Sequence, residues 1–240
     1  MSPTPIETLP GFRRRFIVTP AAGRVSSEVE DDYHCMGVTL HHDGRVATKI
    51  ESHMQRAPWT TCPGAVAQLE QTFTGVPLEG FAARGEKKTN CTHLHDLAVL
   101  AAAHAADGAP MVYDLLVSDP IDGRRRAELR RNGTRVLDWV VADGRIVEPE
   151  ELAGTVFDHL GRWIASLDPE KQEAARLLRW GTILAHGRTI SWERQSDSSR
   201  LPIGNCYTFQ PERAVVAKRV GLIRDFSQGP QPLEEHRPAP

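Results

Sequence analysis

The sequence has few aromatic residues, no long apolar run and no excess of charge of either sign. Aromatic residues make up 6% of the 240 positions, and 29 Lys and Arg face 31 Asp and Glu, so the net charge is −2. A chain this close to neutral has no strongly basic composition to attract nucleic acid. Its apolar runs fall short of the roughly 18 residues that cross a membrane, and the region after Met1 lacks the apolar segment of a secretory signal. We therefore expect neither nucleic acid nor a membrane as a partner.

Common cofactor and hydrolase motifs are also missing. The sequence contains no Gly-x-Gly-x-x-Gly fingerprint, no phosphate-binding loop, no Gly-x-Ser-x-Gly elbow and no His-Glu-x-x-His pair. These absences argue against nucleotide-dependent redox enzymes, kinases, serine hydrolases and zinc proteases. The chemistry left open is cofactor-independent acid–base catalysis, thiol chemistry, or a metal site built from ligands far apart in the sequence.

The four cysteines lack the tight spacings of a disulfide-rich domain. In a chain of this length, that usage indicates reduced thiols and a cytoplasmic location. The length and the ordinary content of apolar (40%) and charged (25%) residues fit one medium-sized domain. We expect a disordered N-terminus over 1–11, a single α+β domain over 12–227 and a disordered, Pro-rich tail over 228–240.

The hydrophobic periodicity predicts an α+β fold, in which antiparallel hairpins and a meander pack against several helices. Asn132-Gly133 and Asp143-Gly144 are typical two-residue hairpin turns that divide the meander. The expected strands are 12–18, 32–42, 45–54, 79–83, 111–117, 124–131, 134–141 and 145–147, with a short strand region around 190–192 and 206–209. The expected helices are 62–73, 90–106, 150–166 and 169–186, and 19–30 is expected to be a loop.

An early hairpin is predicted around Asp43-Gly44, a pair typical of a type I′ turn. This turn places His34 directly opposite His53 and puts Glu51 on the same face of the sheet. A histidine beside a carboxylate suits proton transfer near neutral pH. Two histidines and a carboxylate also form a common metal-binding set. An exposed polar sheet face is the simpler alternative.

Two of the cysteines, Cys62 and Cys91, are predicted at the starts of helices. Pro63 suits the first position of a helix, and Asn90 is a good N-cap residue. The unpaired N–H groups and the dipole of a helix N-terminus stabilise a thiolate and lower the pKa of such a cysteine. Both positions therefore suit a nucleophile, a thiol donor or a metal ligand. The alternative is that both are small buried residues that only pack.

The densest polar cluster is the segment Cys91-Thr92-His93-Leu94-His95-Asp96. On a helix, His95 shares a face with Cys91, whereas His93 aligns with apolar residues. His93 is therefore either a core histidine with satisfied hydrogen bonds or a catalytic group in the first helical turn. The residues expected to bind a substrate beside these candidates are Tyr33, Arg56 and Trp59.

The order of these motifs resembles a bacterial family, the domain of unknown function 2889. The shared features are the early hairpin, Pro58 followed by Cys62-Pro63-Gly64-Ala65, and Asn90-Cys91-Thr92-His93-Leu94 at the start of an alanine- and leucine-rich helix. The resemblance extends over residues 12–190, and Cys-Thr-His-Leu at 91–94 is its most specific part. It implies Cys62, Cys91 and His93 as motif residues without naming a reaction. It also associates the chain loosely with catabolic gene sets for aromatic and acyl compounds.

These patterns favour a cofactor-independent enzyme of lyase or hydrolase type that acts on a small, largely apolar substrate. In this hypothesis His34 or His53 is the base and Glu51 orients it. Cys62 and Cys91 line the site as thiol donor, nucleophile or ligand, and His93 donates a proton or a hydrogen bond. One alternative is a metal or iron–sulfur protein that uses the two cysteines and His93, with a divalent metal as cofactor. The other is a non-catalytic scaffold or regulatory partner, and a homodimer is compatible with all three.

Overall fold

The computed structural model describes residues 4–198 and 202–234, and its contacts divide the chain into two units. We call residues 1–15, 112–190 and 225–240 the meander unit, and residues 16–111 and 191–224 the hairpin unit. Both units combine antiparallel strands with helices, which confirms the predicted α+β class. Each helix among the described residues is too short or too polar to span a bilayer.

The meander unit is built on strands that pair antiparallel in the order β5-β6-β7-β8, as the sequence predicts. Their bounds are β5 Met111–Ser118, β6 Arg124–Arg131, β7 Thr134–Ala142 and β8 Arg145–Glu148. Asn132 and Asp143 have φ angles of 49° and 50°, and the glycine that follows each of them also has a positive φ. This is the backbone that a type I′ turn requires.

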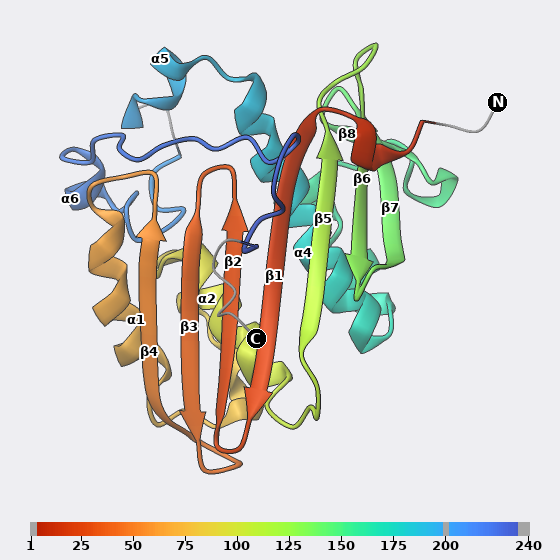
Figure 1. Ribbon diagram of the computed structural model, residues 1–240. Helices are drawn as coiled ribbons and strands as arrows, with labels where there is room; N and C mark the ends of the chain where they lie inside the picture. Colours follow the sequence, from red (N-terminus) through yellow and green to blue (C-terminus); the bar gives the residue numbers. More distant parts are fainter. Residues whose placement is uncertain (1–3, 199–201, 235–240) are drawn as a thin grey trace. The chain divides into compact units, whose positions relative to one another are not determined.

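Helix α4, Pro169–Ala185, packs against β6 and β7 and lies behind them in Figure 1. The Asp168 side chain caps this helix by accepting a hydrogen bond from the Lys171 amide at 2.9 Å. The predicted helix over 150–166 is only partly formed, because Gly154 takes a φ of 82° and interrupts it. The shorter helices of the unit are η1 Ile6–Thr8, η5 Glu150–Leu152, η6 Phe157–His159, α3 Gly161–Ser166 and η7 His186–Thr189.

The strands of the hairpin unit follow the order β4-β3-β2-β1, with α1 against β4 and α2 against β2 and β3 (Figure 1). The strand bounds are β1 Gly11–Ala21, which begins in the meander unit, β2 Arg24–Asp31, β3 Cys35–His42 and β4 Ala47–Arg56. The two main helices are α1 Ala65–Phe73 and α2 Thr92–Ala103, close to the predicted ranges. The short helices are η2 Cys62–Gly64, η3 Leu78–Ala83, η4 Glu86–Lys88, α5 Trp192–Gln195 and α6 Pro211–Ala214.

Three sequence predictions for the hairpin unit are wrong. The predicted loop over 19–30 is the end of β1, a turn at Gly23 with a φ of 70°, and β2, in which Val25 and Val29 are fully buried. The predicted strand over 79–83 is the 3-10 helix η3, where the Gly80 amide bonds back to the Pro77 carbonyl. The predicted strand region around 190–192 and 206–209 is short helix and turn.

The predicted register of the β3–β4 hairpin is also wrong. His53 pairs with Gly37, and His34 precedes β3 altogether. The reason lies in the turn, because the Asp43 carboxylate accepts hydrogen bonds from the amides of Arg45 and Val46 and lengthens the loop. Arg45 and Val46 then pair with the segment at 77–78 instead of extending the hairpin.

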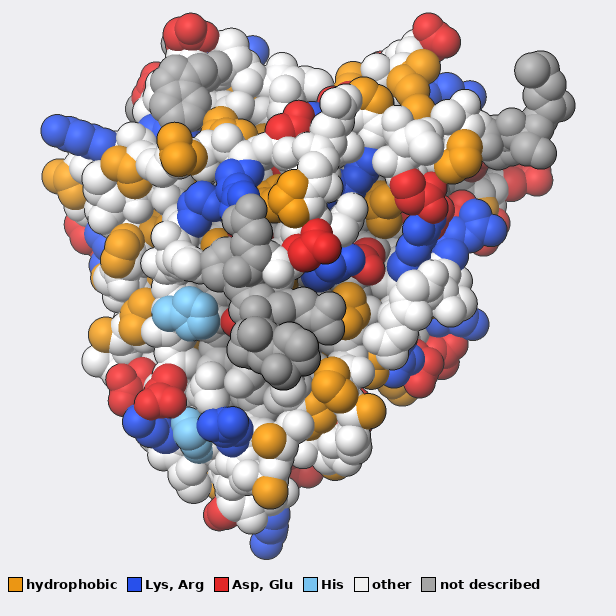
Figure 2. Space-filling view, viewed as in Figure 1, with side chains coloured by type: hydrophobic (Ala, Val, Ile, Leu, Met, Phe, Trp, Pro, Cys, Tyr) orange, Lys and Arg blue, Asp and Glu red, His pale blue; other side chains and the backbone are white. Residues whose placement is uncertain are grey.

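The corrected register separates the predicted histidine pair onto opposite faces of the sheet, because alternate residues of a strand face opposite sides. His53 lies on the polar face, where an added Cβ on Gly37 would come within 2.3 Å of its ring. Glu51 is exposed on the same face and binds Lys49 and His41. Figure 2 shows histidine, acidic and basic side chains together on this face. His34 lies on the other side, toward α2.

We expect Gly11→Ala to destabilise the protein by about 2 kcal/mol or more, because overpacking against rigid backbone cannot relax. A Cβ at Gly11 would lie 2.2 Å from the Val117 carbonyl oxygen, in strand β5 of the same unit. Gly85→Ala is the matched control, since a Cβ there meets nothing within 4 Å. Urea unfolding of both variants measures the difference. Equal stability of the two would contradict the close approach of β1 to β5.

Candidate functional site

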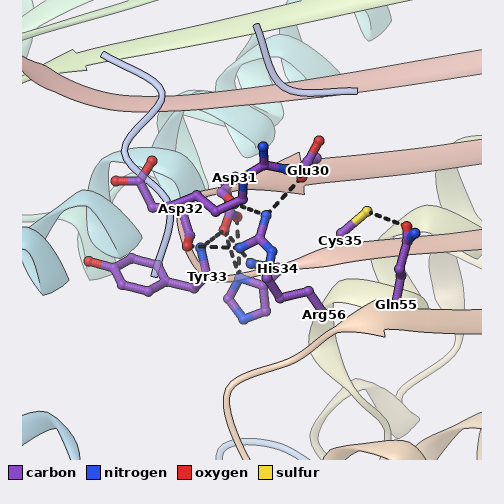
Figure 3. A network of polar contacts seen from close by, with 9 residues as sticks. Glu30, Asp31, Asp32, Tyr33, His34, Cys35, Gln55 and Arg56 are labelled. Carbon is purple, nitrogen blue, oxygen red and sulfur yellow. Dashed lines mark hydrogen bonds and ion pairs between the residues drawn. The ribbon is translucent and has the colours of Figure 1, made fainter. Parts of the chain in front are cut away.

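The candidate site begins at the tight turn between β2 and β3, which the buried Asp31 carboxylate holds together (Figure 3). The Asp31 amide donates to the His34 carbonyl at 2.9 Å and closes the turn. Asp31 Oδ1 accepts hydrogen bonds from the amides of Tyr33 at 2.7 Å and His34 at 2.8 Å. An aspartate that bonds the backbone in this way stabilises a turn locally.

The same carboxylate orients the imidazole of His34. The His34 Nδ1 atom lies 3.0 Å from Asp31 Oδ1 and 3.2 Å from Oδ2, and both side chains are buried. A carboxylate can only accept, so this contact places a proton on Nδ1. Nε2 is then the ring nitrogen that can accept a proton.

A second imidazole, that of His93, stacks on His34. The two ring centroids lie 4.0 Å apart with an interplanar angle of 31°. His93 comes from the first turn of α2, and its Nδ1 atom lies 4.0 Å from the Sγ atom of Cys91. Two imidazoles in contact, one of them oriented by a carboxylate, are the side-chain types from which general acids and general bases are most often built.

Two arginines, Arg56 and Arg224, stabilise this turn through hydrogen bonds. Arg56 donates to Glu30 Oε1 at 2.9 Å and to the carbonyls of Asp31 and Asp32 at 2.7 and 2.8 Å (Figure 3). Arg224 donates to Glu30 Oε1 at 3.3 Å, and its amide bonds the Asp32 carbonyl. Glu30 is 1% exposed, and burying a carboxylate without hydrogen-bond partners of this kind is costly. Arg56, predicted to bind substrate, therefore fixes the turn that carries His34.

A segment from the C-terminal part of the hairpin unit, residues 204–224, covers this region, and we call it the strap. The Tyr207 amide bonds the Asn90 carbonyl at 2.9 Å, beside the start of α2. The Val220 amide bonds the Pro58 carbonyl at 2.8 Å. The strap brings Arg219 over the rings of Tyr33 and Trp59, with its Cζ atom 5.7 and 5.6 Å from their centroids.

The cysteines lie where the sequence predicts, but their thiols are not activated. Cys62 begins η2 just before α1, and Cys91 is the N-cap residue of α2. Burial raises the pKa of the Cys91 thiol to about 12, which outweighs the hydrogen bonds from the amides of Leu94 and His93. Burial also raises the pKa of Cys62, whose Sγ atom accepts a hydrogen bond from Thr208 at 3.3 Å. The prediction of lowered thiol pKa values is therefore wrong, because desolvation of the charged form exceeds the effect of the helix N-terminus.

All four cysteines are free. Within residues 4–198 and 202–234, no group of three or more His, Cys, Asp or Glu side chains is arranged to hold a metal ion.

Sequence reasoning missed Asp31, Glu30, Arg219 and Arg224. The signal for Asp31 was available, since it stands three residues before His34 and a two-residue turn brings such positions together. Arg219 and Arg224 gave no such signal, because their distance along the chain from the turn exceeds the range of any local pattern.

We expect Cys91 to resist alkylation in the folded protein. With a pKa of about 12, only about one Cys91 thiol in ten thousand is a thiolate at pH 8, and the thiolate is the reactive form. Iodoacetamide labelling at pH 8 followed by mass spectrometry measures this, with guanidinium-unfolded protein as the control in which all four cysteines react. Labelling of native Cys91 at the rate of a free cysteine would refute the burial argument.

His95 should make stability depend on pH. Its side chain is 3% exposed, neither ring nitrogen has a hydrogen-bond partner among the described residues, and burial lowers its pKa. Below the unfolded-state pKa of about 6.5 the unfolded chain binds more protons than the folded one, so the free energy of unfolding falls as pH falls.

We therefore compare how the free energy of unfolding falls with pH between pH 6.5 and the lower folded-state pKa of His95. In this range we expect it to fall by up to about 1.4 kcal/mol per pH unit more in wild-type protein than in His95→Met. Urea unfolding across this range measures the difference. His53→Met is the control, because His53 is exposed. Parallel stability curves for wild type and His95→Met would show that the His95 ring is not desolvated.

Comparisons with known proteins give a match to one family model. A search of curated proteins gave no match. Among solved structures, the crystal structure of a viral glycoprotein has 12% identity over 78% of this chain and a TM-score of 0.20, too low to indicate a shared fold. This chain spans 57% of the length of that one. Residues 18–107 match the model of a family described as protein of unknown function (DUF2889), and this segment contains Asp31, His34, Cys91 and His93. The match, over 90 of the 240 residues, supports membership of this segment in the DUF2889 family.

Proposed function

We propose that the hairpin unit carries a general acid–base enzyme of lyase or hydrolase type, acting on a small, largely apolar substrate without a nucleotide cofactor. The observation that supports this proposal is the buried hydrogen bond between Asp31 and His34 Nδ1, with the His93 ring stacked on His34. An oriented imidazole beside a second imidazole provides one group that can accept a proton and one that can donate a proton.

Each residue of the group has a distinct role in this proposal. His34 is the base, acting through Nε2, and Asp31 holds its ring and tautomer. His93 donates a proton or a hydrogen bond to the substrate. Cys91 keeps a neutral thiol beside His93 Nδ1 and positions that ring. A cysteine nucleophile receives no support, because nucleophilic attack needs a thiolate.

His53 and Glu51 are left out of the proposed machinery. The Glu51 carboxylate is exposed, and its partners Lys49 and His41 hold the pKa of Glu51 down to about 2. His53 is exposed on the polar face of the sheet. The expected setting in the bacterial catabolism of aromatic or acyl compounds rests on the family resemblance alone, and the expected cytoplasmic location rests on the cysteine usage.

A structural role for the pair is the competing interpretation, and one observation favours it. Asp31 binds two backbone amides besides the imidazole, so its stabilisation of the turn does not require a catalytic role. The chain offers a comparison in His104, a buried histidine whose Nδ1 atom lies 2.6 Å from Oδ2 of the exposed Asp107. A purely structural pair should behave alike at both positions.

We expect His34→Gln to reduce turnover by about a hundredfold or more, the usual contribution of a general base. His104→Gln should leave turnover unchanged, because His104 lies at the C-terminal end of α2, the opposite end from Cys91 and His93. Proton NMR in D2O, with a panel of small organic acids and esters, detects cleavage, addition and solvent exchange in one assay. Circular dichroism and thermal unfolding verify that both variants are folded. A folded His34→Gln protein with wild-type turnover would contradict the acid–base proposal.

A further inference from the structure

The strap exposes a group of large apolar side chains. Seven large hydrophobic side chains are exposed among the residues that the structure describes, and five of them lie within residues 215–223. These five are Val215, Val216, Val220, Leu222 and Ile223, of which Val215 and Leu222 are the most exposed, at 82% and 80%. Single exposed apolar residues are normal on a protein surface, whereas a concentration of them in one segment is typical of an interaction surface.

Small residues and the backbone fix the strap to the hairpin unit. Ala214 and Ala217 are buried, and Ala217 packs beside Trp59. The Thr60 amide donates to the Lys218 carbonyl at 3.0 Å, and the Lys218 amide donates to Thr60 Oγ1 at 3.1 Å. The strap therefore binds its own unit through alanines and main-chain groups, and it holds the larger apolar side chains out toward solvent.

Two exposed charges flank the most exposed of these side chains. Glu212 and Lys218 stand three residues before and three residues after Val215. In a symmetric contact between two copies of a chain, residue i of one copy meets residue j of the other, and residue j meets residue i. A two-fold axis beside Val215 therefore brings Glu212 of each copy to Lys218 of the other. The segment 212–218 is thus complementary in charge to itself.

The other cations of the strap already have contacts within the chain. Arg213 pairs with Glu212 at 3.0 Å, and a carboxylate, with its two oxygens, can accept from a second cation as well. Arg224 donates to Glu30, and Arg219 lies over aromatic rings. Only Lys218 of these four cations is exposed, whereas an anionic lipid surface recruits clusters of about four or more basic residues. The charges therefore favour a second copy over a lipid surface.

We propose that the strap forms a symmetric contact with a second copy of this chain. The apolar side chains of residues 215–223 form its centre, and Glu212 and Lys218 set its register at the rim. The inference does not depend on the proposed function. It bears on the candidate site because the strap also binds the turn that carries His34, through the Arg224 amide and the Asp32 carbonyl at 2.9 Å. Each copy thereby holds the other's strap in place over that turn.

Sedimentation equilibrium of the full chain over a concentration series measures the association. We expect wild-type protein to form a reversible dimer. Leu222→Glu should weaken the dimer by at least about tenfold, because it buries an unpaired carboxylate in an apolar contact. Ile121→Glu is the matched control, since Ile121 is also exposed but lies in the meander unit, and this variant should associate like wild type. Circular dichroism verifies that both variants are folded.

Charge reversal tests the symmetry of the contact. At low ionic strength, Glu212→Lys and Lys218→Glu should each weaken the dimer by about fivefold, because each change places like charges together twice in a symmetric contact. The variant that carries both changes restores opposite charges and should associate within about twofold of wild type. A general effect of surface charge on solubility would not produce this recovery.

Wild-type protein that stays monomeric over the whole series overturns the inference. So does binding to vesicles of phosphatidylserine and phosphatidylcholine without self-association, which would make the strap a lipid-contact surface. Equal weakening by Leu222→Glu and Ile121→Glu overturns the location of the contact. A double charge variant that associates no better than the weaker single variant overturns the two-fold arrangement. If Leu222→Glu does not fold, Val215→Glu takes its place with the same expected loss and the same control.

Discussion

The hairpin unit depends on the burial of one carboxylate, that of Asp31. Transferring an unpaired carboxylate out of water costs several kcal/mol, so the charge survives there only with strong hydrogen bonds. Two amides of the turn and the His34 imidazole provide them. The turn geometry, the direction of the His34 ring and its stacking on α2 follow from this single requirement. A second carboxylate, Glu30, is buried beside it and needs two arginines.

The sequence predicts the parts of the fold in which local chemistry decides the structure. The meander was predicted correctly because Asn-Gly and Asp-Gly pairs determine the backbone conformation of its turns. Helices α1 and α2 were predicted correctly because apolar stripes and capping residues mark them. The β3–β4 register was predicted wrongly, since Asp43-Gly44, although also an Asp-Gly pair, lies in a longer loop. There, the segment at 77–78 competes for the backbone of Arg45 and Val46. A distant partner thus overrides a local turn preference.

The candidate site shows the same division between local and long-range effects. Cys62, Cys91 and His93 lie at helix starts as predicted, because capping is a local property. Their chemistry was mispredicted, because the pKa of a thiol depends on how much water reaches it, and burial is a property of the whole unit. His34 was identified with the wrong carboxylate. The true partner is three residues away along the chain rather than across the hairpin.

The family match and the strap have a consequence for how this protein could diversify. Asp31, His34 and His93 fall inside residues 18–107, whereas the strap that covers them falls outside that segment. The candidate site therefore combines a buried polar centre from the matched segment with a cover that the segment does not include. A change in the strap would alter this cover without disturbing the buried Asp31 carboxylate. Relatives that share only the matched segment would then be poor guides to the surroundings of this centre.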